Sequence, residues 1–240
     1  MRKRTIAVVL SSLLLASAAA WAAVVTQDGG FELGSPNPVW DEASTNFGTP
    51  LCTVAGCGTG NGTGPRSGTW WAWFGGIGSQ LEVGSLNQDL VIAPGAATLT
   101  FWLEVPSNNN NPDDFLAVSI DETEVFRVTG DAAAAYAEYA QVTLDVSAFA
   151  DGSSHTLTFD STTNPGEVST NFFVDDVALD VQEVLVTCAS EGYTGTKLTW
   201  CRNICEMGYT GATLDMWIHR WINRYRDLPY CAVEGKPQPE

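Results

Sequence analysis

The stretch Ala-Thr-Leu-Thr-Phe-Trp-Leu-Glu-Val, residues 97–105, alternates apolar and polar side chains. Successive side chains of a β-strand point to opposite faces, so this alternation predicts a strand that buries one face. Leu99, Phe101 and Leu103 share the apolar face, and Trp102 lies on the polar one. Shorter stretches repeat the pattern, with apolar positions at Leu116, Val118, Ile120, Val142, Leu144, Val146, Leu157 and Phe159. Turn-forming residues separate them, which predicts an all-β antiparallel sandwich over residues 23–183.

Two acidic stretches frame this region: Asp28-Gly-Gly-Phe-Glu32 near its start and Phe172-Phe-Val-Asp-Asp-Val-Ala-Leu-Asp180 at its end. Together with the strand rhythm around residues 97–103, they resemble the jelly-roll carbohydrate-binding modules of families 4, 9 and 22. The resemblance covers roughly residues 28–180 and implies a jelly-roll β-sandwich. It also implies a polysaccharide or a cell-surface glycan as ligand, and a structural Ca²⁺ ion that ties the first strand to the last.

The same resemblance assigns the Ca²⁺ ligands to Glu32 and Asp175, with Asp28 adding a further oxygen. Ca²⁺ takes roughly six to eight oxygen ligands, and an acid inside an apolar strand needs a partner charge or a hydrogen-bond network. By alternation, Asp175 is expected on the face of Phe173 and Val177. An alternative reading is that Glu32 and Asp175 only accept backbone hydrogen bonds at strand ends.

Sugar sites use aromatic faces surrounded by hydrogen-bonding groups. Trp102 and Glu104 lie on the polar face of their predicted strand, and Trp71 and Trp73 share a face two residues apart. We therefore expect these four residues to contact the ligand, and we expect glycan binding to fade in Trp102→Ala. The competing interpretation is that the tryptophans are buried between the sheets.

The charge of the chain narrows the classes of ligand. The net charge is −17, and residues 23–183 hold 22 Asp and Glu against only Arg66 and Arg127. Such a field repels nucleic acid, whose phosphates are contacted by Lys and Arg, and disfavours anionic membranes. Neutral ligands and divalent cations fit it best.

The first 22 residues have the pattern of a cleavable signal peptide. Arg2, Lys3 and Arg4 precede an apolar run over residues 6–15 and a stretch of small residues that ends near Ala22. Cleavage takes the net charge from −17 to −20, because the leader holds three cations and no acid. The apolar run is too short to span a bilayer, so we expect no membrane insertion. We expect an exported bacterial protein, secreted or periplasmic.

Six cysteines follow the leader, and an even number in an exported chain indicates disulfides. The short spacing of Cys52 and Cys57 predicts a small disulfide loop. Cys201 and Cys205, one helical turn apart, are each expected to pair with Cys188 or Cys231, in an order that the sequence leaves open. Zinc binding is the competing interpretation of these spacings.

Residues 184–240 are predicted to form a small helical subdomain stapled by disulfides. The tetrapeptide Gly-Tyr-Thr-Gly occurs at residues 192–195 and 208–211, and each copy precedes a predicted helix. We expect Thr213 to cap the second helix and Pro229 to end it. Its basic face, His219, Arg220, Asn223 and Arg224, is expected to dock onto the acidic sandwich, with an anionic surface or partner as the alternative.

Catalysis has little support in the sequence. Neither histidine accompanies a nucleophile motif, and the G-x-S-x-G, H-E-x-x-H and phosphate-loop patterns do not occur. We therefore expect a non-catalytic, glycan-binding module. Two alternatives stay open: a surface adhesion or structural protein that binds another protein, and, with less support, a glycoside hydrolase that uses paired carboxylates.

Overall fold

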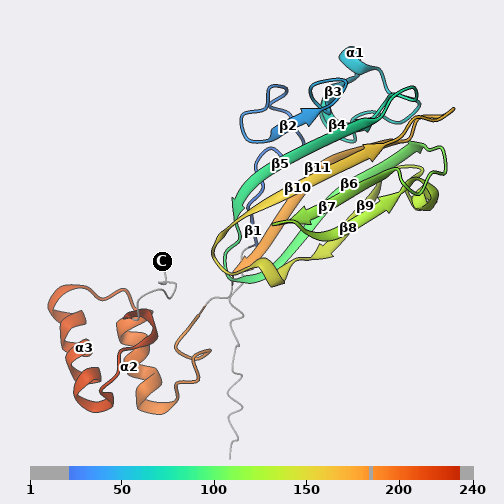
Figure 1. The fold of residues 1–240 in the computed structure, drawn as a ribbon. Helices are drawn as coiled ribbons and strands as arrows, with labels where there is room; N and C mark the ends of the chain where they lie inside the picture. Colours follow the sequence, from blue (N-terminus) through green and yellow to red (C-terminus); the bar gives the residue numbers. More distant parts are fainter. Residues whose placement is uncertain (1–21, 184–185, 233–240) are drawn as a thin grey trace, which may run out of the picture.

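The structure, a computed structural model, describes residues 22–183 and 186–232, so the predicted leader lies almost wholly outside the described residues (Figure 1). Two antiparallel sheets pack face to face, which confirms the predicted jelly-roll sandwich. Sheet A contains, in spatial order, β3 (Leu51–Thr53), β4 (Trp70–Gly75), β11 (Asn171–Glu183), β6 (Gly95–Ser107) and β9 (Ala140–Asp145). Sheet B contains, in spatial order, β2 (Asp41–Ser44), β5 (Glu82–Val91), β10 (Ser154–Thr163), β7 (Phe115–Ile120) and β8 (Thr123–Thr129).

The alternating apolar residues form the core between the sheets. Leu99, Phe101 and Leu103 of β6 are fully buried, as the alternation predicts, and Phe159 of β10 packs edge-on against Phe101. Leu144 is the one predicted core residue that is only partly buried. Short helical turns close the ends of the sandwich: α1 (Val54–Cys57), η1 (Gly130–Tyr136) and η2 (Ser147–Phe149).

The first strand lies against the last one. β1 (Ala22–Val24) pairs antiparallel with β11, and Ala22 lies opposite Gln182. Farther along the same edge of β11, β4 takes over the pairing, with Gly75 opposite Asn171. One strand, β11, therefore runs from the start of the sandwich to the turn that follows β4.

The path of β11 departs from simple alternation at Asp176. Asp176 has a positive φ of 49°, and the register with β6 shifts between Asp175 and Ala178. As a result Val177 joins the core between the sheets, whereas Phe173 contacts the tryptophans of β4 on the outer face. The prediction that Asp175 shares one face with both Phe173 and Val177 is thus wrong for Val177, because a bulge inverts the alternation.

The C-terminal segment folds around a second buried cluster. It contains α2 (Gly195–Cys205), α3 (Gly211–Tyr225) and η3 (Tyr230–Ala232). Both helices begin at the second glycine of the Gly-Tyr-Thr-Gly repeat, so Thr210, not Thr213, occupies the N-cap of α3. α3 ends at Tyr225 because Arg226 adopts a left-handed conformation, ahead of Pro229.

The disulfides confirm the predicted pairing pattern and settle its order. Cys52 pairs with Cys57, and in the C-terminal segment the bonds are Cys188–Cys201 and Cys205–Cys231. The sulfur atoms of Cys188, Cys201 and Cys205 lie within 4.8 Å of one another, but all three are in disulfides. Zinc binding by thiolates is therefore excluded in this oxidised state.

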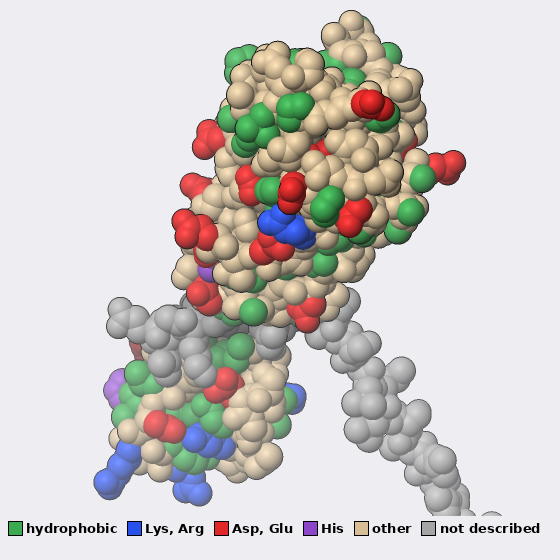
Figure 2. Space-filling model, turned by 45° about the vertical axis from the view of Figure 1, so that its right-hand side comes forward, with side chains coloured by type: hydrophobic (Ala, Val, Ile, Leu, Met, Phe, Trp, Pro, Cys, Tyr) green, Lys and Arg blue, Asp and Glu red, His purple; other side chains and the backbone are tan. Residues whose placement is uncertain are grey.

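Charge is unevenly distributed over the surface. Figure 2 shows Asp and Glu side chains spread over the visible face of the sandwich, and Lys and Arg side chains gathered on the C-terminal segment. Within the described residues, no helix combines the length and the apolar character needed to cross a bilayer.

Candidate functional site

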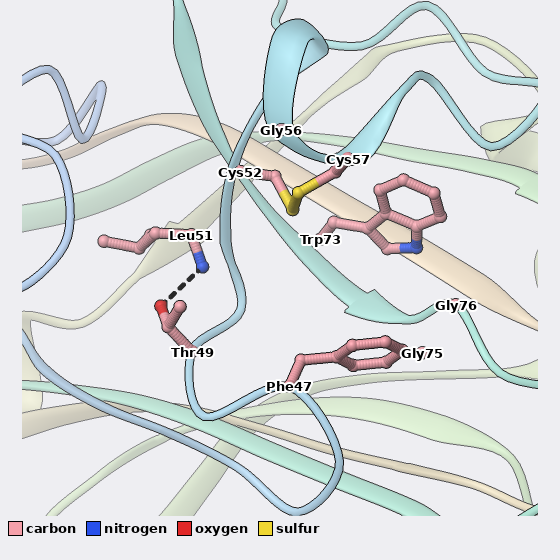
Figure 3. Close-up of a pocket in the computed structure, with 9 residues that line it drawn as sticks. All are labelled: Phe47, Thr49, Leu51, Cys52, Gly56, Cys57, Trp73, Gly75 and Gly76. Atoms are coloured by element: carbon pink, nitrogen blue, oxygen red, sulfur yellow. Dashed lines mark hydrogen bonds between the residues drawn. A yellow bond between two sulfur atoms is a disulfide. The ribbon is translucent and has the colours of Figure 1, made fainter.

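A pocket of about 400 Å³ opens beside the edge strand of sheet A (Figure 3). Its walls come from the loop between β2 and β3, the short helix α1 and the end of β4. The residues that line it are Phe47, Thr49, Leu51, Cys52, Gly56, Cys57, Trp73, Gly75 and Gly76. Figure 3 shows the Trp73 indole and the Phe47 ring extending from separate segments of chain, with the Cys52–Cys57 disulfide beside the indole.

Phe47 forms the outer rim of the pocket. It lies in the loop after β2 and is 55% exposed. The loop is held from both sides: the Phe47 amide donates to Ser44 Oγ at 3.0 Å, and Thr49 Oγ1 donates to Glu42 Oε2 at 2.6 Å. The backbone therefore presents the exposed ring from a fixed position.

Trp73 forms the inner wall. Its ring stacks beside Trp71, with centroids 6.4 Å apart, and meets the edge of Phe173 at 5.1 Å. Its indole Nε1 donates to Asn171 Oδ1 at 2.9 Å. The aromatic neighbours and the hydrogen bond together hold the half-buried indole in one orientation.

A glycine-rich segment covers the outer face of sheet A next to the pocket. We call residues 58–68 the glycine strap. A Cβ on Gly60 would lie 2.4 Å from the Trp73 ring, and one on Gly62 would lie 2.5 Å from Phe173. Only glycine permits this approach, since real Cβ atoms do not come so close. The strap therefore lies directly on the aromatic rings of β4 and β11.

Hydrogen bonds to buried acids fasten the strap. Glu104 accepts from the Thr63 amide at 3.1 Å, and Asp175 Oδ2 accepts from the amides of Arg66 and Ser67 at 2.8 and 3.1 Å. Tyr139 donates its hydroxyl to the Gly64 carbonyl at 2.8 Å. Burial raises the pKa of Glu104, and it raises the pKa of Asp175 to about 6.

The pocket can bind a ligand but has little to offer for acid–base chemistry. The residues around it carry no ionisable side chain, because both cysteines are in a disulfide. The Thr49 hydroxyl is already engaged, since it donates to Glu42 and accepts from the Leu51 amide at 2.9 Å. What the pocket presents is two aromatic rings, a disulfide and backbone polar groups.

The structure places the four predicted ligand residues differently. Trp73 lines the pocket, whereas Trp71 is fully buried under the strap and has no face to offer a ligand. The Arg66 guanidinium lies over the Trp102 ring, and Glu104 is 3% exposed and bonded to Thr63. Three of the four therefore support the strap, and Trp73 alone of them belongs to the pocket.

The predicted Ca²⁺ ligands fall into two groups. Glu32 Oε1 accepts from the amides of Thr69 and Trp70 at 2.8 and 3.0 Å, and Gly68 separates these from the two amides that bond to Asp175. A Cβ on Gly30 would lie 3.9 Å from both Asp175 Oδ1 and Glu32 Cγ. Both side chains therefore lie beside Gly30, where they accept backbone hydrogen bonds from residues 66–70.

Asp28 forms the second group. Its carboxylate accepts from the Leu33 amide and from Asn37 Nδ2, and its carbonyl accepts from the Trp40 indole. The Asp28 oxygens therefore bond to a different part of the chain, residues 33–40, from the amides that bond to Glu32 and Asp175. Among the described residues, no three carboxylates lie within 4.8 Å of one another.

Sequence reasoning missed Phe47, which lines the pocket, and Asn171, which bonds to Trp73. Phe47 carried a usable signal, since a single large apolar residue between Asn46 and Gly48 belongs to no alternating pattern. Asn171 carried none, because its role depends on which strand lies beside β11.

No protein-family model and no curated protein sequence matches the chain. A family 61 carbohydrate-binding module, TmCBM61, solved in complex with β-1,4-galactotriose, is similar at 16% identity and a TM-score of 0.46, over 67% of this chain and 99% of that one. The CBM22-1 xylan-binding domain from Paenibacillus barcinonensis is similar at 12% identity and a TM-score of 0.42, over 70% and 99%. A Stig cyclase from Fischerella sp. TAU is similar at 16% identity and a TM-score of 0.42, over 68% and 100%. All three similarities have low sequence identity and TM-scores below 0.5.

Proposed function

We propose that the sandwich is a non-catalytic binding module that holds an uncharged saccharide in the pocket between Phe47 and Trp73. The observation that carries the proposal is that two aromatic rings border one pocket whose lining has no charged side chain, in a chain of net charge −17. Sugar rings present C–H faces that pack on aromatic rings, and their hydroxyls bond to backbone and side-chain polar groups.

The excess of acidic residues in the sandwich favours the same class of ligand. Acidic polysaccharides and nucleic acids would meet repulsion before they reached the rings. A neutral glycan pays no such penalty, so we propose a neutral polysaccharide or cell-surface glycan as the partner.

The test is a glycan array probed with the full mature chain, followed by titration of the best neutral oligosaccharide. We expect Phe47→Ala to weaken binding by about 10-fold, as for an aromatic anchor, with an unchanged melting temperature. Leu33→Ala is the matched control, because Leu33 is 61% exposed and does not line the pocket. An array without a signal above background, or equal affinity in Phe47→Ala and the wild type, would refute the proposal.

We also propose that Glu32 and Asp175 bind one Ca²⁺ ion together with backbone carbonyl oxygens. The donor set fits a hard cation, since both groups are carboxylates and both side chains lie beside Gly30. Asp175 is fully buried with a raised pKa, which is the condition that a neighbouring cation relieves. Bound there, the ion would hold the start of the sandwich and the strap to β11.

Finally, we propose that the protein is exported through the leader at residues 1–22. The three disulfides support an oxidising compartment, extracellular or periplasmic.

A further inference from the structure

Asn171, the first residue of β11, lies behind the pocket wall and does not line it. It is 4% exposed and stands between two strands, opposite Gly75 of β4 on one side and Ser107 of β6 on the other. A buried amide at this position must find hydrogen-bond partners within the protein.

Asn171 bonds to the two residues that form the inner wall of the pocket. Its Oδ1 accepts from Trp73 Nε1 at 2.9 Å and from the Gly76 amide at 2.6 Å. Both partners are obligate donors, so the atom that faces them is the oxygen. Its Nδ2 donates to Ser107 Oγ at 2.8 Å, and that hydroxyl donates to the Ser169 carbonyl at 2.9 Å. The amide is therefore held at both ends.

The two bonds to Oδ1 join separate parts of the wall. Trp73 supplies the aromatic face, and Gly76 lies in the turn after β4, close to the edge of the same indole. Phe173, two residues along β11, supports the indole from another side. Without Oδ1, the indole would lose its one polar restraint, and the turn at Gly76 would lose its link to the ring.

We propose that Asn171 is a positioning residue of the pocket: its side-chain oxygen fixes the Trp73 indole and the Gly76 amide in the arrangement that receives the ligand. This inference rests on the proposed saccharide site and adds a residue that does not touch the ligand. Immobilising a free side chain on binding lowers affinity, so the effect of Asn171 is expected in the dissociation constant.

The test compares Asn171→Asp with Asn171→Leu, which have nearly the same size. Aspartate keeps an acceptor for Trp73 and Gly76, whereas leucine removes it. Both replacements disturb a buried site and are expected to lower the melting temperature. We expect Asn171→Leu to bind the best neutral oligosaccharide of the array about 3- to 10-fold more weakly, and Asn171→Asp to stay within about 2-fold of the wild type.

A second measurement follows the Trp73 indole N–H directly by NMR of ¹⁵N-labelled protein. Its resonance, assigned with Trp73→Phe, should lose protection from solvent exchange in Asn171→Leu and keep it in Asn171→Asp. Ser107→Ala, which frees only Nδ2, should give a smaller loss and serves if the leucine variant does not fold.

The outcomes separate this inference from the proposed function. If the wild type binds no neutral glycan, the saccharide site is wrong, while the indole resonance still decides whether Asn171 positions Trp73. Equal affinities of the leucine and aspartate variants, or an indole N–H as protected in Asn171→Leu as in the wild type, would overturn the positioning role.

Discussion

The guanidinium carbon of Arg66 lies 3.7 Å from the centre of the Trp102 ring, and the same guanidinium pairs with Asp176. The Arg66 side chain therefore covers the face of Trp102, which alternation places on the outside of β6. Trp102 holds the end of the glycine strap, and the aromatic rings available to a ligand lie instead at Phe47 and Trp73.

Trp102→Ala is therefore expected to change stability and not ligand affinity. A cation–π contact contributes about 0.5–1 kcal/mol at a partly exposed site, and the lost packing adds to it. We expect the free energy of unfolding to fall by about 1–3 kcal/mol in urea titration, with glycan affinity within about 2-fold of the wild type. Trp73→Ala is the comparison that should lose affinity. Loss of glycan binding in a folded Trp102→Ala variant would instead show that Trp102 contributes to the ligand site.

Ca²⁺ is expected to raise the melting temperature relative to chelator-treated protein. An ion at about 100 times its dissociation constant stabilises by about 2.7 kcal/mol, which corresponds to a rise of several degrees for a domain of this size. Glu32→Gln should abolish the rise. Asp28→Asn should retain it, whatever its own melting temperature, because Asp28 bonds to Asn37 and Trp40 and not to residues 66–70. The same melting curve with chelator and with Ca²⁺ in the wild type would dismiss the site.

The two disulfides of the C-terminal segment are expected to stabilise that segment alone. Cys205–Cys231 closes 26 residues of chain, so loop-closure entropy gives it about 3.5 kcal/mol. Because this segment has a buried cluster of its own, the double variant Cys205→Ser and Cys231→Ser should lose the segment's transition in calorimetry. The main transition of the sandwich should stay in place. The variant Cys52→Ser and Cys57→Ser is the control, and a fall of the sandwich transition in the tail variant would show that the two cores are coupled.

His155 is expected to make the stability of the sandwich depend on pH. Its ring nitrogens bond to Asp121 at 2.6 Å and to Asp151 at 3.1 Å, and the Asp121 hydrogen bond raises the pKa of His155. The folded state therefore holds the imidazole proton more tightly than the unfolded state. The stabilisation is complete below the ordinary histidine pKa of about 6.5 and is lost as the pH rises through the raised value.

Urea titrations between about pH 5 and pH 9 measure this effect. The difference in unfolding free energy between the wild type and His155→Gln should be largest at the acidic end and shrink toward the alkaline end. It should stay near 1 kcal/mol or less, because both aspartates are exposed. A difference that grows with pH would contradict the assignment of a protonated imidazole.

The core of the sandwich was predictable because burial between two sheets imposes a period of two. Leu99, Phe101 and Leu103 obey it, and their faces follow from the sequence alone. The same alternation correctly predicted that Trp102 points outward, but it did not predict that Arg66 covers its ring. The outer face is covered by a segment from elsewhere in the chain, the glycine strap. The strap has no alternating apolar residues from which its position could be predicted.

The site was predictable only in part for a similar reason. Trp73 was identified from its residue type, and Phe47 was missed although both border one pocket. Their proximity depends on the loop after β2 reaching the end of β4, a contact between sheets that local patterns do not encode. At Asp176 the left-handed backbone shifts the register, and no rule of alternation anticipates such a bulge.

Because β1 pairs with β11, the first and last strands of the sandwich lie side by side. Ala22 and Gln182 lie side by side, so the chain enters and leaves the sandwich at one end, while Asn171 and the pocket wall lie toward the other end of the same strand. At about 3.3 Å per residue, eleven steps of strand separate the two ends by roughly 35 Å. A tether attached where the chain enters or leaves the sandwich would therefore hold the pocket at the far end of the domain, away from the point of attachment.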